Sequence, residues 1–435
     1  MEFALDSGNT AWMLTAASLV LLMTPGLAFF YGGMVRGKSV LNMMMMSFAA
    51  IGVVGLIWVL YGYSGTFGPD LGGGWLGNPF TYFGLQNFTD DDSLMASTGV
   101  PFLVAAGYQA TFAIITVALI SGAIADRMKF SAWLVFAGIW VTVVYMPLAH
   151  WVWGGGLLSA TGITEGLSTP IDFAGGTVVH IDAGVAGLAL AILLGRRKGW
   201  PREPMRPHNL PFVMLGAALL WFGWFGFNAG SEFGADSTAG RAWLNTMLAT
   251  CVAMLAWLAT EKLRDGHATS LGAASGVVAG LVAITPAAAA VDTWGAIAVG
   301  LVAGVLCALA VGLKFRFGFD DSLDVVGVHA VGGLVGTLLI GFFATDKNGG
   351  WYPDGAMNGL FYGGGLTQLA TQAIVAACAV LFSFTATYVI ALILKATIGL
   401  RVSDEVEVSG IDLAVHAETA YETLGVGARV VTEVK

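Results

Sequence analysis

Long apolar runs alternate with short polar or glycine-rich segments along almost the whole of this 435-residue sequence. A helix needs about 20 apolar residues to cross the hydrocarbon core of a bilayer, which is about 30 Å thick. The pattern therefore predicts eleven transmembrane helices, at residues 11–31, 41–64, 99–124, 131–149, 172–195, 209–229, 240–260, 270–290, 293–313, 325–344 and 367–395. The weakest boundaries flank Pro286 and Asp292, where the eighth and ninth runs nearly merge.

The composition also indicates a membrane protein. Hydrophobic residues make up 57% of the chain and charged residues only 11%, whereas soluble domains carry about 25% charged residues. The 61 glycines suit helices that pack closely in lipid, where small residues let backbones approach. No basic stretch is interleaved with aromatic residues, which argues against a nucleic-acid partner. We expect an all-α integral membrane protein in a lipid bilayer.

The cysteines and the start of the chain add two expectations. Cys251, Cys307 and Cys378 each fall inside an apolar run without paired spacing, so we expect buried, inert thiols and no disulfide framework or metal site. The first residues include acids, and no Lys or Arg precedes Arg36. Because a signal peptide needs a positive start, we expect the first run to be a retained helix.

The positive charges predict the orientation. Cytoplasmic loops of membrane proteins carry the excess of Lys and Arg. With the N-terminus outside, only Arg241 and Lys347 fall in outer loops, so 17 of the 19 basic residues lie inside (19 − 2 = 17). An odd number of spans then places the C-terminus inside. On this topology, Asp70 and Asp90 face outward and Arg202 faces inward.

The composition changes after the eleventh run. Residues 401–435 are polar and acidic, and they are too few to form a hydrophobic core of their own. We therefore divide the chain into a membrane domain, residues 1–400, and a cytoplasmic tail, residues 401–435.

Two segments of the sequence repeat each other without a gap. "DFAGGTVVHIDAGVAGLAL" begins at Asp172 and "DSLDVVGVHAVGGLVGTLL" begins at Asp321, and each places an Asp eight residues before a His. The first opens the fifth span from outside and the second opens the tenth span from inside. We therefore predict two five-helix repeats of inverted orientation plus a last helix, an arrangement typical of transporters with a site near the midplane.

The repeat places its two histidines at one depth. Eight helical residues rise about 12 Å, so from opposite faces of a core about 30 Å thick His180 and His329 each arrive about 3 Å from the centre. An ionisable residue within the membrane is a functional candidate by default. Because burial disfavours the charged imidazolium, a neutral pair sharing one proton would suit a small hydrogen-bonding molecule such as NH3.

The acids of the repeat have a structural interpretation as well. Asp172 and Asp321 stand where a helix N-cap belongs and can accept bonds from free backbone N–H groups. Asp172 is also a candidate source of negative field at the outer entrance. Asp182 lies about 200° around the helix from His180, so we expect it to face another helix rather than a pore.

Aromatic residues cluster at the outer ends of two spans. "HWVWGGGLL" follows the fourth span and "WFGWFGFNAGSEF" ends the sixth. Taken singly, either cluster is typical of an interfacial aromatic belt. Together they predict a cation site, because a Trp face attracts NH4+ and a Ser hydroxyl accepts an N–H bond.

Four blocks resemble signatures of the ammonium transporter (Amt/Mep/Rh) family, and the resemblance runs from the first span to the tail. The blocks are "DFAGGTVVHIDAG", "WFGFNAGS", "AITPAAA" and "DDSLDVVGVH". By motif position, His180 and His329 match the twin pore histidines of the family. Asp172 matches its Asp near the entrance. Asp182 departs from members that carry Asn, without an expected effect on the pore.

The resemblance also assigns the outer site. Trp153 in "HWVWGGG" matches the vestibule Trp that binds the cation, and Ser231 in "FNAGS" matches its hydrogen-bonding Ser. Phe112 in "YQATF" and Phe227 in "WFGFN" match the two stacked rings that close the vestibule. The Trp and Ser favour the Amt branch over the Rhesus branch.

The family implies further properties of the chain. These are transport of ammonium or methylammonium across the plasma membrane without enzymatic activity or a cofactor, a homotrimer with one pore per subunit, and a tail that responds to PII-type regulators. Two alternatives remain open from the residues. The histidines could be axial ligands of a b-type haem, or the fold could act as an ammonium sensor that signals through its tail.

Overall fold

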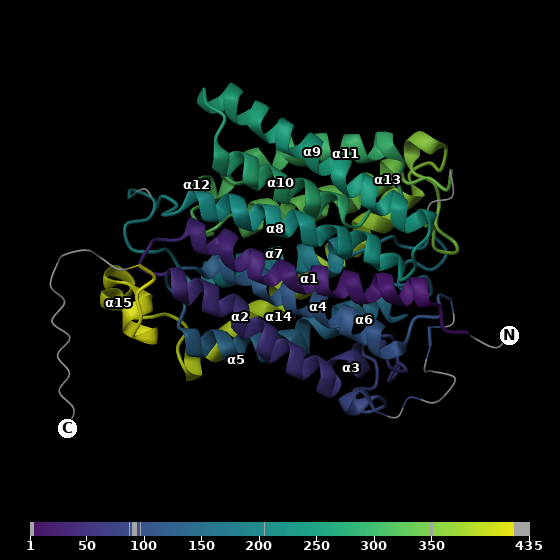
Figure 1. Cartoon of the computed structure of the whole chain (residues 1–435), viewed down its shortest axis with the longest axis horizontal. Helices are drawn as coiled ribbons and strands as arrows, with labels where there is room; N and C mark the ends of the chain where they lie inside the picture. Colours follow the sequence, from purple (N-terminus) through teal and green to yellow (C-terminus); the bar gives the residue numbers. More distant parts are fainter. Residues whose placement is uncertain are drawn as a thin grey trace.

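The chain folds into a bundle of long helices lying side by side (Figure 1). The computed structural model describes residues 4–86, 88, 94–95, 97–203, 205–347 and 351–421. Within these residues, ten helices are long and apolar enough to cross a membrane. Their bounds are Ser7–Met34, Val40–Phe67, Phe102–Ile124, Phe130–Trp153, Gly176–Leu194, Leu210–Glu232, Ser237–Asp265, Thr293–Phe317, Val326–Phe343 and Thr367–Thr397.

Several of these spans contain a change of helix type. A π-helical turn, Trp58–Gly62, joins α2 (Val40–Ile57) to α3 (Tyr63–Phe67). Another, Val141–Tyr145, joins α5 (Phe130–Trp140) to α6 (Met146–Trp153). The repeated segments each open with one, so Gly176–Ile181 precedes α7 (Asp182–Leu194) and Val326–Ala330 precedes α13 (Val331–Phe343). Such π-helical turns occur often at functional sites.

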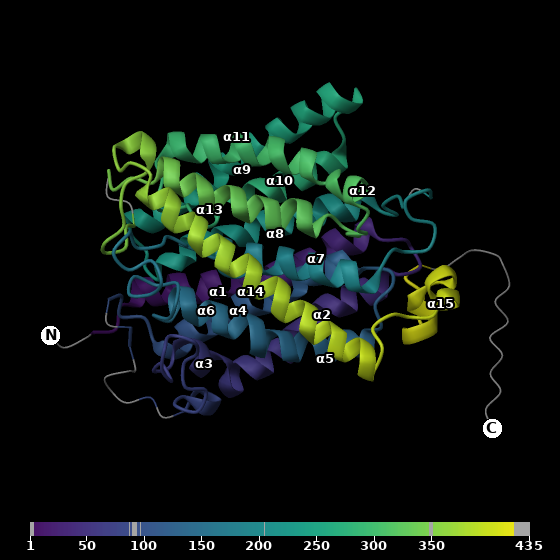
Figure 2. The same cartoon turned by 180° about the vertical axis from the view of Figure 1, so that it is seen from behind.

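The remaining helices are regular. They are α1 (Ser7–Met34), α4 (Phe102–Ile120), α8 (Leu210–Ala229), α9 (Ser237–Asp265), α10 (Ser270–Ile284), α11 (Thr293–Ala310), α12 (Leu313–Phe317), α14 (Thr367–Thr397) and α15 (Asp404–Ser409). Figure 2 shows α14 crossing the back of the bundle diagonally, where it packs on α7, α13 and α5.

The eighth predicted span, residues 270–290, is too long. The helix α10 ends at Ile284, and residues 285–290 form turns. Pro286 has no N–H with which to continue the hydrogen bonding of the helix, and Thr285 before it is the C-cap. The segment after α10 is then held against the segment after α13, because Thr345 donates its backbone N–H to the Ala290 carbonyl at 2.9 Å.

Several other predicted boundaries differ from the structure by a few residues, and two of them concern the site. The fourth span does not end at residue 149, because α6 continues through Trp153 and carries that Trp on the helix rather than in the loop. The fifth span begins at Gly176 instead of 172. Of the thiols expected to be buried, Cys307 is buried while Cys251 and Cys378 are half-buried, and all three are free.

Helices approach most closely where glycines replace side chains. A Cβ atom on Gly216 of α8 would lie 2.3 Å from the backbone nitrogen of Phe30 on α1. That contact is impossible, so these two helices touch at backbone distance. The abundance of glycine in the sequence therefore has a direct packing consequence.

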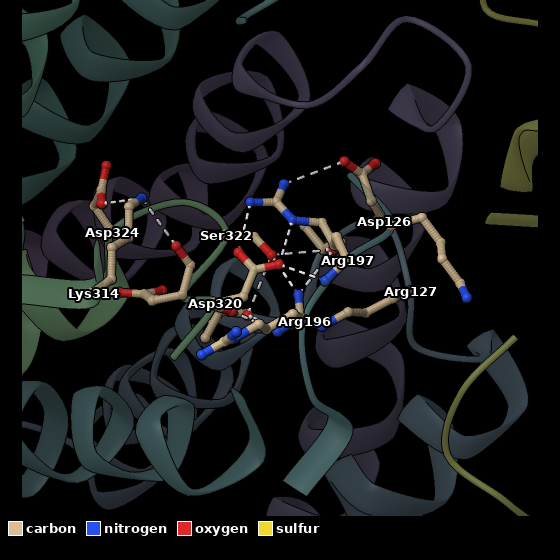
Figure 3. A network of polar contacts seen from close by, with 12 residues as sticks. Asp126, Arg127, Arg196, Arg197, Lys314, Asp320, Ser322 and Asp324 are labelled. Carbon is tan, nitrogen blue, oxygen red and sulfur yellow. Dashed lines mark hydrogen bonds and ion pairs between the residues drawn. The ribbon is translucent and has the colours of Figure 1, made fainter. Parts of the chain in front are cut away.

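The end of the bundle that carries α15, the tail end, lies opposite the end at which α1 begins, the far end (Figure 1). A buried ionic network holds the tail end together (Figure 3). The Arg197 guanidinium pairs with the Asp320 carboxylate at 2.9 Å and with Asp126 at 3.5 Å. Arg127 donates to the backbone carbonyls of Asp320 at 2.6 Å and Gly195 at 2.9 Å.

The network affects the ionisation of its members. Burial alone would raise the pKa of Asp320, but the hydrogen-bonded Arg197 outweighs burial and holds the pKa below its usual value. Burial lowers the pKa of Arg127 to about 10. These loop cations were expected only to mark the inner side, yet they also connect the end of α7 to the segment before α13.

The tail packs on the helices of its own chain. Glu407 of α15 is buried and accepts hydrogen bonds from Arg401 at 2.6 Å and from the backbone N–H of Lys198 at 2.6 Å. The Asp412 carboxylate accepts the backbone N–H groups of Leu41 and Asn42 at 3.0 and 2.8 Å. Asp412 therefore caps the start of α2, whose own N-cap residue makes no side-chain cap bond.

Candidate substrate pathway

A cavity of about 420 Å³ opens at the far end of the bundle. Four of the residues predicted from the sequence line it, namely Phe112, Trp153, Asp172 and Ser231. They come from α4, the end of α6, the loop before Gly176 and the turn after α8. The structure therefore brings together residues more than 100 positions apart in the sequence. We call this space the outer cavity.

Two stacked phenylalanines close the inner side of the outer cavity. The rings of Phe112 and Phe227 lie 4.0 Å apart at an interplanar angle of 14°. Both side chains are buried. Phe112 lines the outer cavity, and Phe227 lines a second, much smaller space of about 10 Å³ on the other side of the pair. The stacked pair therefore separates the two spaces.

The smaller space contains both predicted histidines. His180 and His329 line it together with Phe227 and Trp224. Their Nδ1 atoms are 3.4 Å apart, and their rings lie 5.4 Å apart at 27°. Both residues are almost fully buried, at 1% and 3% exposure. The remaining lining side chains are aliphatic or aromatic, so the two imidazoles are the ionisable groups beside this space.

Two glycines of the repeated segments allow the histidines to meet. A Cβ atom on Gly184 would lie 2.2 Å from the backbone nitrogen of Ala330, next to His329. A Cβ atom on Gly333 would lie 3.1 Å from the Cβ of His180. Each segment therefore presents a glycine to the histidine region of the other. The close approach of the two backbones sets the distance between the imidazole rings.

The capping predictions for Asp172 and Asp321 are confirmed. Asp172 accepts four backbone N–H bonds, from residues 175–178, at 2.6 to 3.2 Å. Asp321 accepts the N–H groups of Val325 and Val326 at 3.1 and 2.8 Å. A carboxylate in either position also complements the positive end of the helix dipole.

The repeated segments run in opposite directions. At the tail end, the backbone N–H of Arg197, just after α7, bonds to Asp320, just before the second segment, at 2.7 Å. At the far end, Thr169, just before the first segment, bonds to the Gly355 carbonyl beyond α13 at 3.1 Å. An inverted relation between whole five-helix halves stays a prediction.

Hydrogen bonds fix two residues of the outer cavity. The Trp153 indole N–H donates to the Asp172 carbonyl at 2.9 Å. Its ring meets the Phe112 ring edge-on, at 6.1 Å and 81°. The Ser231 hydroxyl donates to the Phe227 carbonyl at 2.9 Å. Its oxygen keeps the capacity to accept a bond from a ligand.

Asp182 faces away from the pathway, as expected from its helical position. It lines neither of the two spaces, and Ser383 of α14 donates to its backbone carbonyl at 2.9 Å. Its carboxylate oxygens are buried and have no hydrogen-bond partner among the described residues.

Two residues near the site were given no individual role in the sequence-based prediction. Tyr108 donates its hydroxyl to the Phe227 carbonyl at 2.8 Å and lies 3.3 Å from the Ser231 hydroxyl. Trp224 stacks on His180 at 5.3 Å and 20°, and its N–H donates to Thr285 at 2.8 Å. Both residues lie inside motifs that we noted, but the spacing along the chain gave no sign of their partners.

The geometry argues against the haem hypothesis. Metal–nitrogen bonds to histidine are about 2 Å long, so two axial ligands would stand about 4 Å apart with a porphyrin between them. The histidine nitrogens are 3.4 Å apart, and the space around them measures about 10 Å³. An aromatic cavity, a closed ring pair and a polar pair in an apolar space instead suit passage of a small polar molecule.

Comparison with known proteins identifies relatives along the whole chain. A sequence model of the ammonium transporter family matches residues 11–421. The ammonium transporter of Mycobacterium tuberculosis is 58% identical over 436 residues, which cover 96% of this chain and 91% of the relative. That of Aquifex aeolicus is 50% identical over 425 residues, covering 97% and 95%.

Solved structures have the same fold. The crystal structure of Candida albicans Mep2 matches with a TM-score of 0.82 and 33% identity, covering 92% of this chain and 87% of that chain. A protein described as a sensor Amt protein matches with a TM-score of 0.83 and 29% identity, covering 94% and 98%.

Proposed function

Because the chain belongs to the ammonium transporter family, we propose that it carries ammonium across the plasma membrane. The observation that carries the mechanism is the stacked pair of Phe112 and Phe227, which lies between an aromatic cavity and a buried histidine pair. A cation can bind on the first side. Only a neutral molecule is suited to the second.

Recruitment takes place in the outer cavity. The Trp153 ring attracts NH4+ through its electron-rich face, and the Ser231 oxygen accepts one N–H bond. The Asp172 carbonyl accepts the Trp153 indole N–H, and the carboxylate of the same residue adds a negative field to the wall of the cavity. These contacts gather the cation without the need for a cofactor.

Deprotonation must precede passage beyond the phenylalanines. Moving a bare ion into an apolar medium costs tens of kcal/mol by the idealised Born figure. Neutral NH3 avoids most of that cost but still needs hydrogen-bond partners. His180 and His329 supply them. One ring can take up the proton released from NH4+ while the other ring releases its own proton on the far side. Net transport is then electrogenic.

The topology and assembly that we propose follow the sequence and the family. The chain crosses the membrane eleven times, with α10 as the short eighth span, and the far end faces outward. The tail end faces the cytoplasm, where a PII-type trimer meets a homotrimer of this chain and closes its pores. The docked positions of Glu407 and Asp412 support a tail that communicates with α2 and the loop after α7.

A sensory role is the second candidate function. It is favoured by the docking of the tail on the helices of its own chain. Through this contact, the binding of ammonium in the pathway could change the position of the tail and so be detected by a partner protein. On this hypothesis the chain binds ammonium and changes the exposure of its tail while transporting little.

Current recordings on reconstituted protein distinguish the two functions. Pulses of ammonium onto proteoliposomes should give saturating currents that potassium neither produces nor reduces. Potassium resembles ammonium in charge and size but has no proton to lose before the phenylalanine pair. Potassium currents would contradict the mechanism. The absence of any ammonium current, in protein that still binds ammonium, would favour the sensor.

A further inference from the structure

The outer cavity is much larger than the ion it is proposed to recruit. Its volume is about 420 Å³, whereas a molecule the size of water, and thus ammonium, occupies about 30 Å³ in the liquid. Cavities that bind small organic molecules begin at about 300 Å³. The space therefore fits a cation with several carbon atoms.

Aromatic rings from separate segments form the walls of this cavity. Six of them are Phe67, Phe102, Phe112, Trp153, Phe233 and Trp351. The edge-on arrangement of Phe112 and Trp153, at 81°, places two ring planes at right angles to each other. Rings that converge from different directions are the usual means by which proteins recognise quaternary ammonium groups.

The charges around the cavity favour a cation as well. Among the described residues that line it, Asp172 is the one carboxylate, and no Lys, Arg or His is present. Ser159 and Ser231 also line the cavity, and each hydroxyl donates to a backbone carbonyl while its oxygen can still accept a bond from a ligand. Aromatic faces, one carboxylate and hydroxyl acceptors together match an organic cation that carries a hydroxyl.

We propose that the outer cavity also binds quaternary ammonium alcohols of the choline class, and that these block the pathway without crossing it. A quaternary nitrogen has no N–H to give up, so it cannot become neutral ahead of the phenylalanine pair. The rings stacked at 4.0 Å and the space of about 10 Å³ behind them exclude a trimethylammonium group. The binding does not depend on the proposed function, whereas the block rests on it.

Binding can be measured on purified protein without transport. Titration with choline chloride, followed by intrinsic tryptophan fluorescence and by calorimetry, should saturate with a dissociation constant of about a millimolar or below, because several rings face one cation. The neutral isostere 3,3-dimethylbutan-1-ol should bind at least about tenfold more weakly, since it lacks only the charge. Equal binding of the two compounds, or no saturation with choline, would overturn the proposal.

A pair of tryptophan variants locates the site. Trp351→Leu removes one ring of the cavity and should weaken choline binding about threefold or more. Trp294→Leu is the matched control, because Trp294 is 73% exposed on α11 and does not line the cavity. Phe233→Leu tests a second wall of the cavity if Trp351→Leu folds poorly. Choline affinity unchanged in both cavity variants would place the binding elsewhere and refute the assignment.

Transport measurements separate this inference from the proposed function. Choline added on the outer side should reduce ammonium currents competitively and should itself produce none. Ammonium currents in protein that choline neither binds nor inhibits would refute the inference alone. Choline binding in protein that never carries ammonium would refute the proposed function and leave the binding site standing.

Discussion

The Nδ1 atoms of His180 and His329 face each other at 3.4 Å, and both rings are almost entirely shielded from solvent. Only one proton can lie between two facing nitrogens, so one ring donates through Nδ1 and the other carries its proton on Nε2. A proton taken up at the free Nε2 of the donating ring, passed on through the Nδ1–Nδ1 bond and matched by release of the proton on the other Nε2 exchanges these roles and moves one proton across the pair. Both rings remain neutral in either arrangement, which fits an apolar surrounding.

Replacement of Gly184 by alanine tests how closely the two repeated segments must approach. The new Cβ would lie 2.2 Å from the Ala330 nitrogen. Overpacking of this kind costs about 1–3 kcal/mol, so the free energy of unfolding should fall and the melting temperature of the purified protein should drop. Ammonium currents should fall with it, because His329 is displaced.

Gly52→Ala is the matched control. It lies in α2, and an added Cβ there meets nothing within 4 Å. Alanine in a helix is favoured over glycine by about 0.5–1 kcal/mol, so this variant should be as stable as the wild type or more stable. Equal melting temperatures for both variants would show that the contact between the two repeated segments tolerates a methyl group.

Asp320→Asn tests the buried network at the tail end. The substitution removes the nearer of the two carboxylates that pair with the buried Arg197 guanidinium and leaves Asp126 at 3.5 Å. Breaking a buried pair costs up to about 3–5 kcal/mol. The folded-state pKa of Asp320 lies below its ordinary value of about 3.9. Its contribution is therefore complete at neutral pH and is lost as the pH falls through the folded-state pKa.

The two proteins should consequently differ most in melting temperature near pH 7 and converge below about pH 4. Thermal unfolding between pH 3 and pH 8 measures this. A difference that stays constant over the whole range would show that the Asn variant fails for a reason other than charge.

Asp412→Ala tests the docking of the tail. The carboxylate caps α2 from a distance of 370 residues along the sequence, and loss of a cap costs about 0.5–2 kcal/mol. Limited proteolysis should cut the tail faster in this variant than in the wild type. In a separate experiment, deletion of the residues after Arg401 should abolish regulation by a PII-type partner. Glu418→Ala is the matched control, since Glu418 is exposed. A truncated protein that is regulated like the wild type would exclude this role.

Cysteine labelling tests the orientation. In a background without Cys251, Cys307 and Cys378, a membrane-impermeant maleimide should label Asp70→Cys in intact cells and should label Arg202→Cys only after the cells are opened. Both positions are exposed. Asp90, for which outward exposure was also predicted, lies outside the described residues. Labelling at position 202 in intact cells would reverse the topology.

The sequence predicts the histidine pair because one repeated spacing determines depth in a membrane. An Asp eight residues before each His fixes the helix start and therefore the height of the ring, and the caps of Asp172 and Asp321 have the predicted form. The resemblance to a family supplied the outer residues. It also supplied the phenylalanine pair, which the structure finds stacked.

Other features depend on contacts between distant segments and could not be read from the pattern. The helix α6 continues through Trp153 despite Pro147, because the π-helical turn before it places the proline in a first helical turn. The hydrogen bonds of Tyr108 and the cap supplied by Asp412 join residues more than 100 positions apart. Hydropathy contains no information about such partners.

The most direct test of the account is the ammonium current of His180→Ala, His329→Ala and the double variant, recorded from proteoliposomes containing equal amounts of folded protein. If the pair relays a proton and passes NH3, each single variant should lose the ammonium-evoked charge movement or uncouple it from uptake. The double variant should be little worse than either alone, because both residues act in one step. Wild-type currents in both single variants would reduce the histidines to packing residues and contradict the mechanism.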